Sequence, residues 1–295
     1  GGVAAVLNLA SQCGDMEAQR WVAALLYTML QRFFTEGIPG AWPAIISAVC
    51  SEQGVHALLV LVYSVCSQVS LNALRAVAIL TREEGGMDVR RRLFVAGVML
   101  PTATLGMRGG EEAELAASEI ACNLCKDRNN LQDMMQGTDF LMLCIHFVQS
   151  ALSRLESRPP AEGAGDQHLI LLLSLEALCT VIANPKNHAT FIDKQGLQLW
   201  MTVASKHSTD PQVCLHIARG LESLVSNSIL RSGLSADQSL KTTIKTLFSH
   251  KDTKIDSAAE HCLVLLAHGE AAEETDTLAD LPSTTATSVA AGSDE

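Results

Sequence analysis

The chain has 295 residues, of which 48% are apolar and 18% charged, so it can build a sizeable core and is not a wholly disordered protein. Most of its net charge of −11 comes from the end of the chain, where seven acidic residues and no Lys or Arg follow His268. The rest carries only about −4 and lacks the excess of basic residues from which nucleic-acid-binding proteins draw most of their affinity. We therefore expect no nucleic-acid partner.

The longest apolar run, residues 57–63, is far shorter than the 18 or so residues that a membrane span requires, which predicts no membrane insertion. The chain begins with Gly1 rather than Met, and we expect it to be a piece of a longer protein. Its nine cysteines are odd in number and lie mostly within apolar stretches. This pattern is typical of reduced core thiols and predicts an intracellular, cytoplasmic protein.

Apolar residues recur at helical spacing along the whole chain, while Pro and Gly are sparse within the periodic stretches, which predicts an all-α protein. In chain order, Asp15 is a suitable N-cap for a helix that continues through Leu26. Asp210 followed by Pro211 marks a later start, because Pro in the first helical turn costs no hydrogen bond. A further helix is expected to begin near Asp252.

The chain also contains internal repeats. Glu119 and Cys122 recur 57 residues later as Glu176 and Cys179, each within an apolar helical stretch. A Gly followed by an apolar residue precedes a predicted helix at several places, namely Gly2-Val3, Gly54-Val55, Gly97-Val98 and Gly196-Leu197. We expect these glycines to form tight turns with positive φ, since no Cβ obstructs that conformation. Internal repeats of helical segments predict stacked helical units that share one continuous core.

These features resemble armadillo repeats, whose unit is a short helix, a Gly-apolar turn, a second helix and a longer third helix. Residues 91–101 and 187–197 resemble the first helix and its turn, and residues 1–30 resemble a second and third helix. The resemblance implies a right-handed superhelix of about six irregular armadillo or HEAT-like units over residues 1–268. HEAT repeats, which lack the separate first helix, are the alternative.

Two segments depart from a regular array. Residues 154–167 contain two Pro and no apolar periodicity, which predicts an inserted loop between helices of one unit. Residues 269–295 are acidic and poor in large apolar side chains, a composition typical of disorder. We therefore divide the chain into a repeat domain, 1–268, and a tail, 269–295.

The sequence contains little that indicates chemistry. Cys122 and Cys125 form a Cys-x-x-Cys motif without a second pair to complete a zinc site, and Cys179 takes the place of Cys122 in the next unit. We interpret both as core residues. His261 and His268 lack the spacing of a metal-binding helix motif, and no catalytic nucleophile motif or phosphate-binding loop occurs. We expect no enzyme activity, metal or cofactor.

The resemblance implies that third helices line a groove that holds a peptide, often through an Asn amide. Asn123 fits that place, but Thr180, Ser223 and Val264 replace it in later units. The Trp that nuclear-import adaptors carry four residues earlier is also missing. The candidate groove residues are Trp21, Arg75, Glu119, Asn123, Glu176, Thr180, Arg219 and Ser223. A separate basic cluster, Arg90, Arg91 and Arg92, is either a solvated face or an anchor for an acidic partner.

The sequence favours a non-enzymatic scaffold or adaptor that binds a peptide or a folded domain of another protein. One alternative is a myosin co-chaperone of the UCS type, whose repeats are similar in style to residues 119–125 and 137–143. Another is a structural brace in a cytoskeletal or ciliary assembly. The oligomeric state and the face that binds stay open at this point.

Overall fold

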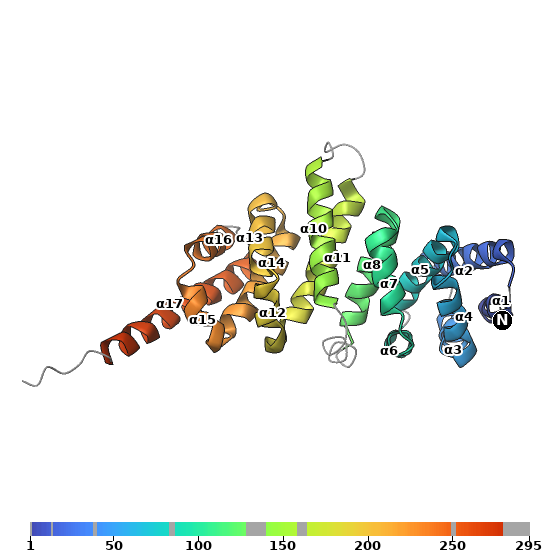
Figure 1. The fold of residues 1–295 in the computed structure, drawn as a ribbon, viewed down its shortest axis with the longest axis horizontal. Helices are drawn as coiled ribbons and strands as arrows, with labels where there is room; N and C mark the ends of the chain where they lie inside the picture. The colour runs from blue at the N-terminus through green and yellow to red at the C-terminus, as the bar shows by residue number, and fades with distance from the viewer. Residues whose placement is uncertain are drawn as a thin grey trace, which may run out of the picture.

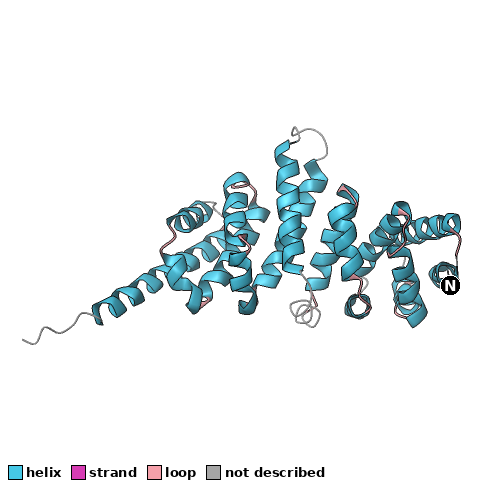
Figure 2. Cartoon of the chain, in the orientation of Figure 1, coloured by secondary structure: helices cyan, strands magenta, loops and turns pink. Residues whose placement is uncertain are grey.

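The structure, a computed structural model, describes residues 2–12, 14–37, 40–82, 86–127, 140–157, 164–248 and 252–279, with side chains of the last helix described as far as His268. These residues form helices joined by short turns, and no strand occurs among them. The helices follow one another along an elongated molecule in the order of the sequence (Figure 1, Figure 2). The fold is an all-α solenoid, as predicted.

The helices repeat in groups of three. The first helices are α3 (Ala41–Val49), α6 (Gly86–Val95), α12 (His188–Asp193, after the 3-10 turn η2, Pro185–Asn187) and α15 (Ser228–Ser235). The second helices are α1 (Gly2–Gln12), α4 (Glu52–Val62), α7 (Met99–Arg108), α10 (Phe140–Ser157), α13 (Gly196–Lys206) and α16 (Gln238–Phe248). The third helices are α2 (Met16–Glu36), α5 (Ser67–Thr81), α8 (Glu111–Cys125), α11 (Ala164–Ile182), α14 (Pro211–Ser226) and α17 (Thr253–Ala279). The segment between α8 and α10 lies largely outside the described residues.

Each third helix packs against the next, so that α2, α5, α8, α11, α14 and α17 form a continuous layer along the solenoid. The apolar spacing of these helices places their buried side chains between neighbouring units. On the α14–α17 pair, Leu221, Val225 and Cys262 are buried and Leu265 is half-buried. The apolar stripes inferred from the sequence therefore have the correct register on these two helices.

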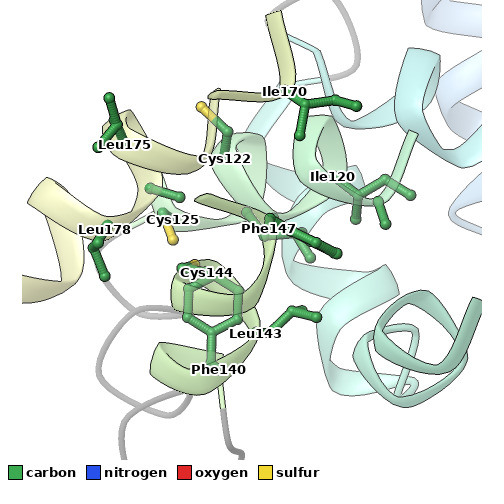
Figure 3. Close-up of a cluster of buried hydrophobic side chains, with 14 of the residues drawn as sticks. Ile120, Cys122, Cys125, Phe140, Leu143, Cys144, Phe147, Ile170, Leu175 and Leu178 are labelled. Atoms are coloured by element: carbon green, nitrogen blue, oxygen red, sulfur yellow. The ribbon is translucent and has the colours of Figure 1, made fainter. Parts of the chain in front are cut away.

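The core between α8, α10 and α11 contains three thiols among large apolar side chains (Figure 3). Cys122 and Cys125 of α8 and Cys144 of α10 are each at most 2% exposed. Burial raises the pKa of all three thiols, so they remain protonated and unreactive at neutral pH. The interpretation of the Cys-x-x-Cys motif as part of the core is confirmed.

The predicted helix starts are stabilised by side-chain caps. Asp15 accepts a hydrogen bond from the backbone N–H of Ala18, and Asp210 accepts two at the start of α14. Asp252 caps α17 by accepting from the N–H of Lys254. Each carboxylate also interacts favourably with the positive end of its helix dipole.

The C-terminal ends of three third helices are capped by residues of the following first helix or its start. Arg90 of α6 donates from one guanidinium nitrogen to the carbonyls of Thr81 and Arg82 at the end of α5, at 3.2 Å each. Arg231 of α15 caps the end of α14 from two nitrogens: Nε donates to the carbonyl of Val225 at 3.0 Å and Nη2 to that of Ser226 at 3.2 Å. At the end of α11, two caps act together: Asn187 bonds the carbonyl of Val181, and His188 that of Ile182. The caps satisfy carbonyls that a helix end leaves without partners.

Only one of the four Gly-apolar turns has the expected conformation. Gly97 has a φ of +88° and ends α6, as predicted. Gly54 and Gly196 instead lie within the first turn of a second helix, and neither has a positive φ. A Cβ on Gly196 would lie 2.1 Å from the ring of Phe191, and one on Gly54 would lie equally close to the carbonyl oxygen of Ala48. These two glycines are therefore required for close packing, and the positive φ expected there was wrong.

The expected boundaries of the inserted loop and of the tail also need correction. Helix α10 continues to Ser157 and α11 begins at Ala164, so residues 154–157 and 164–167 are helical, and residues 158–163 lie outside the described residues. Packing stabilises the last turn of α10 and the first turn of α11, because Arg154 pairs with Glu114 of α8 and Gln167 is buried. The backbone of α17 continues beyond His268 to Ala279, since Ala and Glu favour helix.

One described helix is long and apolar enough to cross a membrane by length and composition. It is the stretch Gly165–Ile182 of α11, which has a mean hydropathy of 1.4 and is half buried in the structure. The bent pair α3 and α4 meets the same criterion only if its two helices, at 78°, are counted as one. The buried half of the α11 stretch packs against α8, α10 and α14, which is a use for its apolar side chains within the solenoid core.

Candidate functional site: the surface of the third helices

Two rows of paired side chains cross the first three third helices. In the first row, the guanidinium of Arg75 lies 5.6 Å from the ring centroid of Tyr27 and forms a 2.9 Å ion pair with Glu112. In the second row, the guanidinium of Arg82 lies 4.3 Å from the ring centroid of Phe34 and pairs with Glu119. We call these the Tyr27 row and the Phe34 row. Each links α2, α5 and α8 through a cation held between an aromatic face and a carboxylate.

The regular spacing follows from helix geometry. The two aromatic residues, the two arginines and the two glutamates are each separated by seven residues, which is two helical turns on the same face. All three helices are aligned side by side, so the same offset on each produces two parallel rows. Because both arginines are only about 30% exposed, their pairs are partly screened from solvent.

A hollow of 230 Å³ lies on α2, α5 and α8 between the two rows. It is lined by apolar side chains of α5 and α8, by polar side chains of both rows and by Asp166 of α11. The apolar members are Ala78, Ile79, Leu115 and Ala116. The hollow therefore offers an apolar base between two rows of charges.

Further pairs join the third helices. Lys126, the C-cap of α8, lies 3.7 Å from Glu176 of α11, and His261 of α17 is hydrogen-bonded to Glu222 of α14 at 2.7 Å. A second hollow, of 360 Å³, is lined by Arg219, Glu222 and the end of α11, among other groups. The surface thus carries both signs of charge along its length.

The structure brings together only some of the candidate groove residues. Arg75 and Glu119 belong to the two rows and line the first hollow. Arg219 and Ser223 line the second hollow, and the hydroxyl of Ser223 donates to the carbonyl of Ile182. These residues therefore form two separate clusters on the same layer.

The other four candidates have different surroundings. Asn123 is buried, and its amide donates to the hydroxyl of Thr81 at 3.4 Å, so it ties α8 to α5. The hydroxyl of Thr180 donates to the carbonyl of Glu176 within α11, while Glu176 itself pairs with a lysine of α8. Trp21 is 70% exposed on α2 and does not line either hollow.

The basic cluster is not a single surface. Arg90 is 8% exposed and caps α5, whereas Arg92 is exposed. Arg91 is half-buried. The three guanidinium groups therefore do not form one exposed anchor, because that of Arg90 is buried and used inside the fold.

Among the residues missed from the sequence, Tyr27, Arg82, Glu112 and Asp166 line the first hollow, and Phe34 contacts Arg82 in the Phe34 row. A signal for most of them is present. Arg75 and Glu112 are separated by 37 residues, and so are Arg82 and Glu119. The same separation thus recurs for two pairs of opposite charges on two adjacent helices. This recurrence indicates that each Arg faces its Glu. Asp166 has no such signal, because it was assigned to a loop.

The titratable groups of the described residues give little sign of catalysis. Burial raises the pKa of Cys179 to about 12 and lowers that of His216 on α14. Cys66 differs, because its hydrogen bond from Arg20 lowers the pKa of its thiol at the start of α5. No group of three or more His, Cys, Asp or Glu suited to a metal ion occurs within the part of the chain that the structure describes.

Comparisons with known structures agree with this architecture. Computationally designed armadillo repeat proteins for modular peptide recognition are similar over 89% of this chain and 99% of theirs, with a TM-score of 0.67 and 14% identity. A designed armadillo repeat protein in complex with the peptide (KR)4 is similar over 90% of this chain and all of its own, with a TM-score of 0.66 and 13% identity. The fold is that of an armadillo repeat protein.

A similar fold occurs in a further known structure. A chain from a structure that concerns a phosphorylation switch in the interaction between cadherin and beta-catenin has a TM-score of 0.69 and 15% identity. The match covers 91% of this chain and 52% of that one. No protein-family model matches the sequence, and a search of curated proteins found no match. At such low identities, the likeness concerns the fold.

Proposed function

We propose that this armadillo-like chain is a non-enzymatic protein-interaction scaffold that binds a segment of a partner on the layer of third helices. The observation that supports this most directly is the first hollow, where an apolar base lies between the Tyr27 row and the Phe34 row. A hollow with apolar side chains and fixed charged groups in its lining is a feature of protein-binding surfaces. The peptide complex of a designed protein with the same fold is consistent with this use.

The partner in this proposal is a peptide or an exposed segment of a folded protein, and neither a nucleic acid nor a membrane. The low net charge of the repeat domain supports the first exclusion. An intracellular, cytoplasmic location is proposed with it, because the eight described cysteines are all free thiols. An adaptor role is the preferred form of the scaffold, with a UCS-type co-chaperone or a structural brace as the alternatives.

The experiment is a selection of twelve-residue random peptides, displayed on yeast, against the intact chain. Two charge-reversal variants are matched. Glu176→Lys reverses a 41% exposed carboxylate that pairs with Lys126 across third helices, and Glu156→Lys reverses a 52% exposed one that pairs with Lys206 across second helices. Both variants place two lysines together on the surface, so their effects on stability should be similar and small.

We expect the selected peptides to share a motif and to lose binding to Glu176→Lys while retaining binding to Glu156→Lys. Circular dichroism checks that both variants are folded. Peptides that respond only to Glu156→Lys would place binding on the second helices and overturn the proposal. Failure to select any shared motif would do so as well, and would favour a structural brace.

A further inference from the structure

We infer that the hollow between the Tyr27 row and the Phe34 row accepts a large apolar side chain of a partner, and that Glu112 and Asp166 bind a Lys or Arg adjacent to it in the partner's sequence. This inference rests on the proposed function and names the class of segment that the first hollow selects. The two rows set the geometry, because they lie two helical turns apart on each helix and leave the apolar base between them.

The size and lining of the hollow favour one apolar side chain. Its 230 Å³ is several times the roughly 30 Å³ that a water molecule occupies in the liquid. Ala78, Ile79 and Ala116 are nearly buried, and Leu115 is half-buried at the base. An apolar side chain that covers the half-buried Leu115 and Tyr27, which also line the hollow, gains affinity through the hydrophobic effect. Alanine at two of these four positions, Ala78 and Ala116, leaves room above the helices.

The charges around the hollow favour a cationic neighbour. Arg75 contacts both the ring of Tyr27 and the carboxylate of Glu112, and it is only 28% exposed. The carboxylate of Glu112 is 63% exposed, and Asp166 is also exposed at the rim of the hollow. An anionic partner would have to displace a carboxylate to reach a guanidinium, whereas a cationic partner reaches two carboxylates directly. The accessible charge is therefore negative although the hollow contains both signs.

This mode of recognition does not use an Asn amide. Asn123, the one Asn at the expected place, donates to Thr81 inside the fold. Selectivity in the hollow thus depends on the partner's side chains, through one apolar contact and one charge contact. Both contacts can be removed separately in a synthetic peptide.

The probes are three fluorescein-labelled peptides that bind to the intact chain in a fluorescence anisotropy titration. The first is Gly-Ser-Arg-Leu-Arg-Ser-Gly, the second has Ser in place of Leu, and the third has Glu in place of both Arg. We expect the first peptide to bind at least tenfold more tightly than either of the others. The paired substitution Glu112→Gln and Asp166→Asn should reduce its affinity at least tenfold while preserving side-chain shape, and Glu156→Gln on the second helices should leave it unchanged.

The outcomes separate this inference from the proposed function. Tighter binding of the acidic peptide, lost in Arg75→Gln, would overturn the inference and leave the scaffold in place. Equal binding of the first and second peptides would refute the apolar contact in the hollow. If none of the three binds while the displayed library selects peptides that respond to Glu176→Lys, the inference fails alone. If the library also selects nothing, both fail.

Discussion

The cap that Arg90 forms on α5 predicts a measurable loss of stability in Arg90→Met. Methionine keeps an unbranched apolar side chain similar to the aliphatic stem of arginine, so the change removes mainly the guanidinium. That group donates to two carbonyls at the end of α5, at 3.2 Å each. Hydrogen bonds to a charged group contribute about 1.5–3 kcal/mol, and a cation at a partly buried helix C-terminus up to about 2 kcal/mol.

An opposing cost reduces the expected effect. Arg90 is 8% exposed and its Nε has no hydrogen-bond partner within the described structure, so its charge is partly desolvated without full compensation. A single nitrogen also supplies both hydrogen bonds. We therefore expect Arg90→Met to lower the free energy of unfolding by about 2 kcal/mol. The stability of Arg90→Lys should lie between that of the unchanged chain and that of Arg90→Met, because lysine keeps the charge but not the planar geometry of the donor.

The assay is urea unfolding followed by circular dichroism, with Arg92→Met as the matched control from the same helix. Arg92 is exposed, and its substitution should change stability by less than about 0.5 kcal/mol. Hydrogen exchange should also show faster exchange of the amides in the last turn of α5 in Arg90→Met alone. Equal stability of the two variants, with equal exchange at α5, would refute the cap as a source of stability.

Three further predictions follow from the packing and from the charges. Leu221→Ala should lower the unfolding free energy by about 2–5 kcal/mol, because Leu221 is 1% exposed between α14 and α17; a change near zero in urea unfolding would contradict that register. Glu114→Ala should cost about 1–3 kcal/mol, because it removes the 2.6 Å partner of Arg154, which is 32% exposed, and the double substitution of both to Met should recover most of the loss in the same assay. Burial lowers the pKa of His216 in the folded chain. As the pH falls, the imidazole is therefore protonated in the unfolded chain first, so the stability that the neutral ring provides is present above about pH 6.5 and lost below it. His216→Gln should therefore lose less thermal stability between pH 7.5 and 5.5 than the unchanged chain, and an equal loss would contradict this.

The fold was predictable because each of its determinants is local in sequence. The caps at Asp15, Asp210 and Asp252 lie next to the helices that they start, and the apolar stripe of α14 follows from its own spacing. Stacking then follows, since a helical pair with one apolar face must bury it against a neighbour. The boundaries of α10 and α11 were less predictable because packing across units, such as the pair of Glu114 with Arg154, extends helices beyond their apolar period.

The candidate site was predictable only in part because its contacts join different units. Arg75 and Glu119 were selected from the sequence, but each belongs to a separate row with partners on adjacent helices. Asn123 matched the armadillo groove position, yet its amide is consumed by Thr81, which no pattern within α8 reveals. Two polar residues on the same face of one helix can differ in exposure, because the neighbouring helix covers one and leaves the other in solvent. The alignment of the two helices depends on side chains from both, so the sequence of one helix does not determine it.

The caps at the ends of α5, α11 and α14 explain how irregular repeats stack without a conserved turn. Each cap joins a first helix to the third helix of the preceding unit, so it restricts the angle between consecutive units. The chemistry differs, since Arg90 and Arg231 use a guanidinium whereas His188 uses a ring nitrogen that contacts the carbonyl of Ile182 at 2.7 Å. The acceptor is a backbone carbonyl at all three places, because the last turn of a helix leaves carbonyls without partners in the helix. Different donor side chains can therefore make the same kind of contact between units.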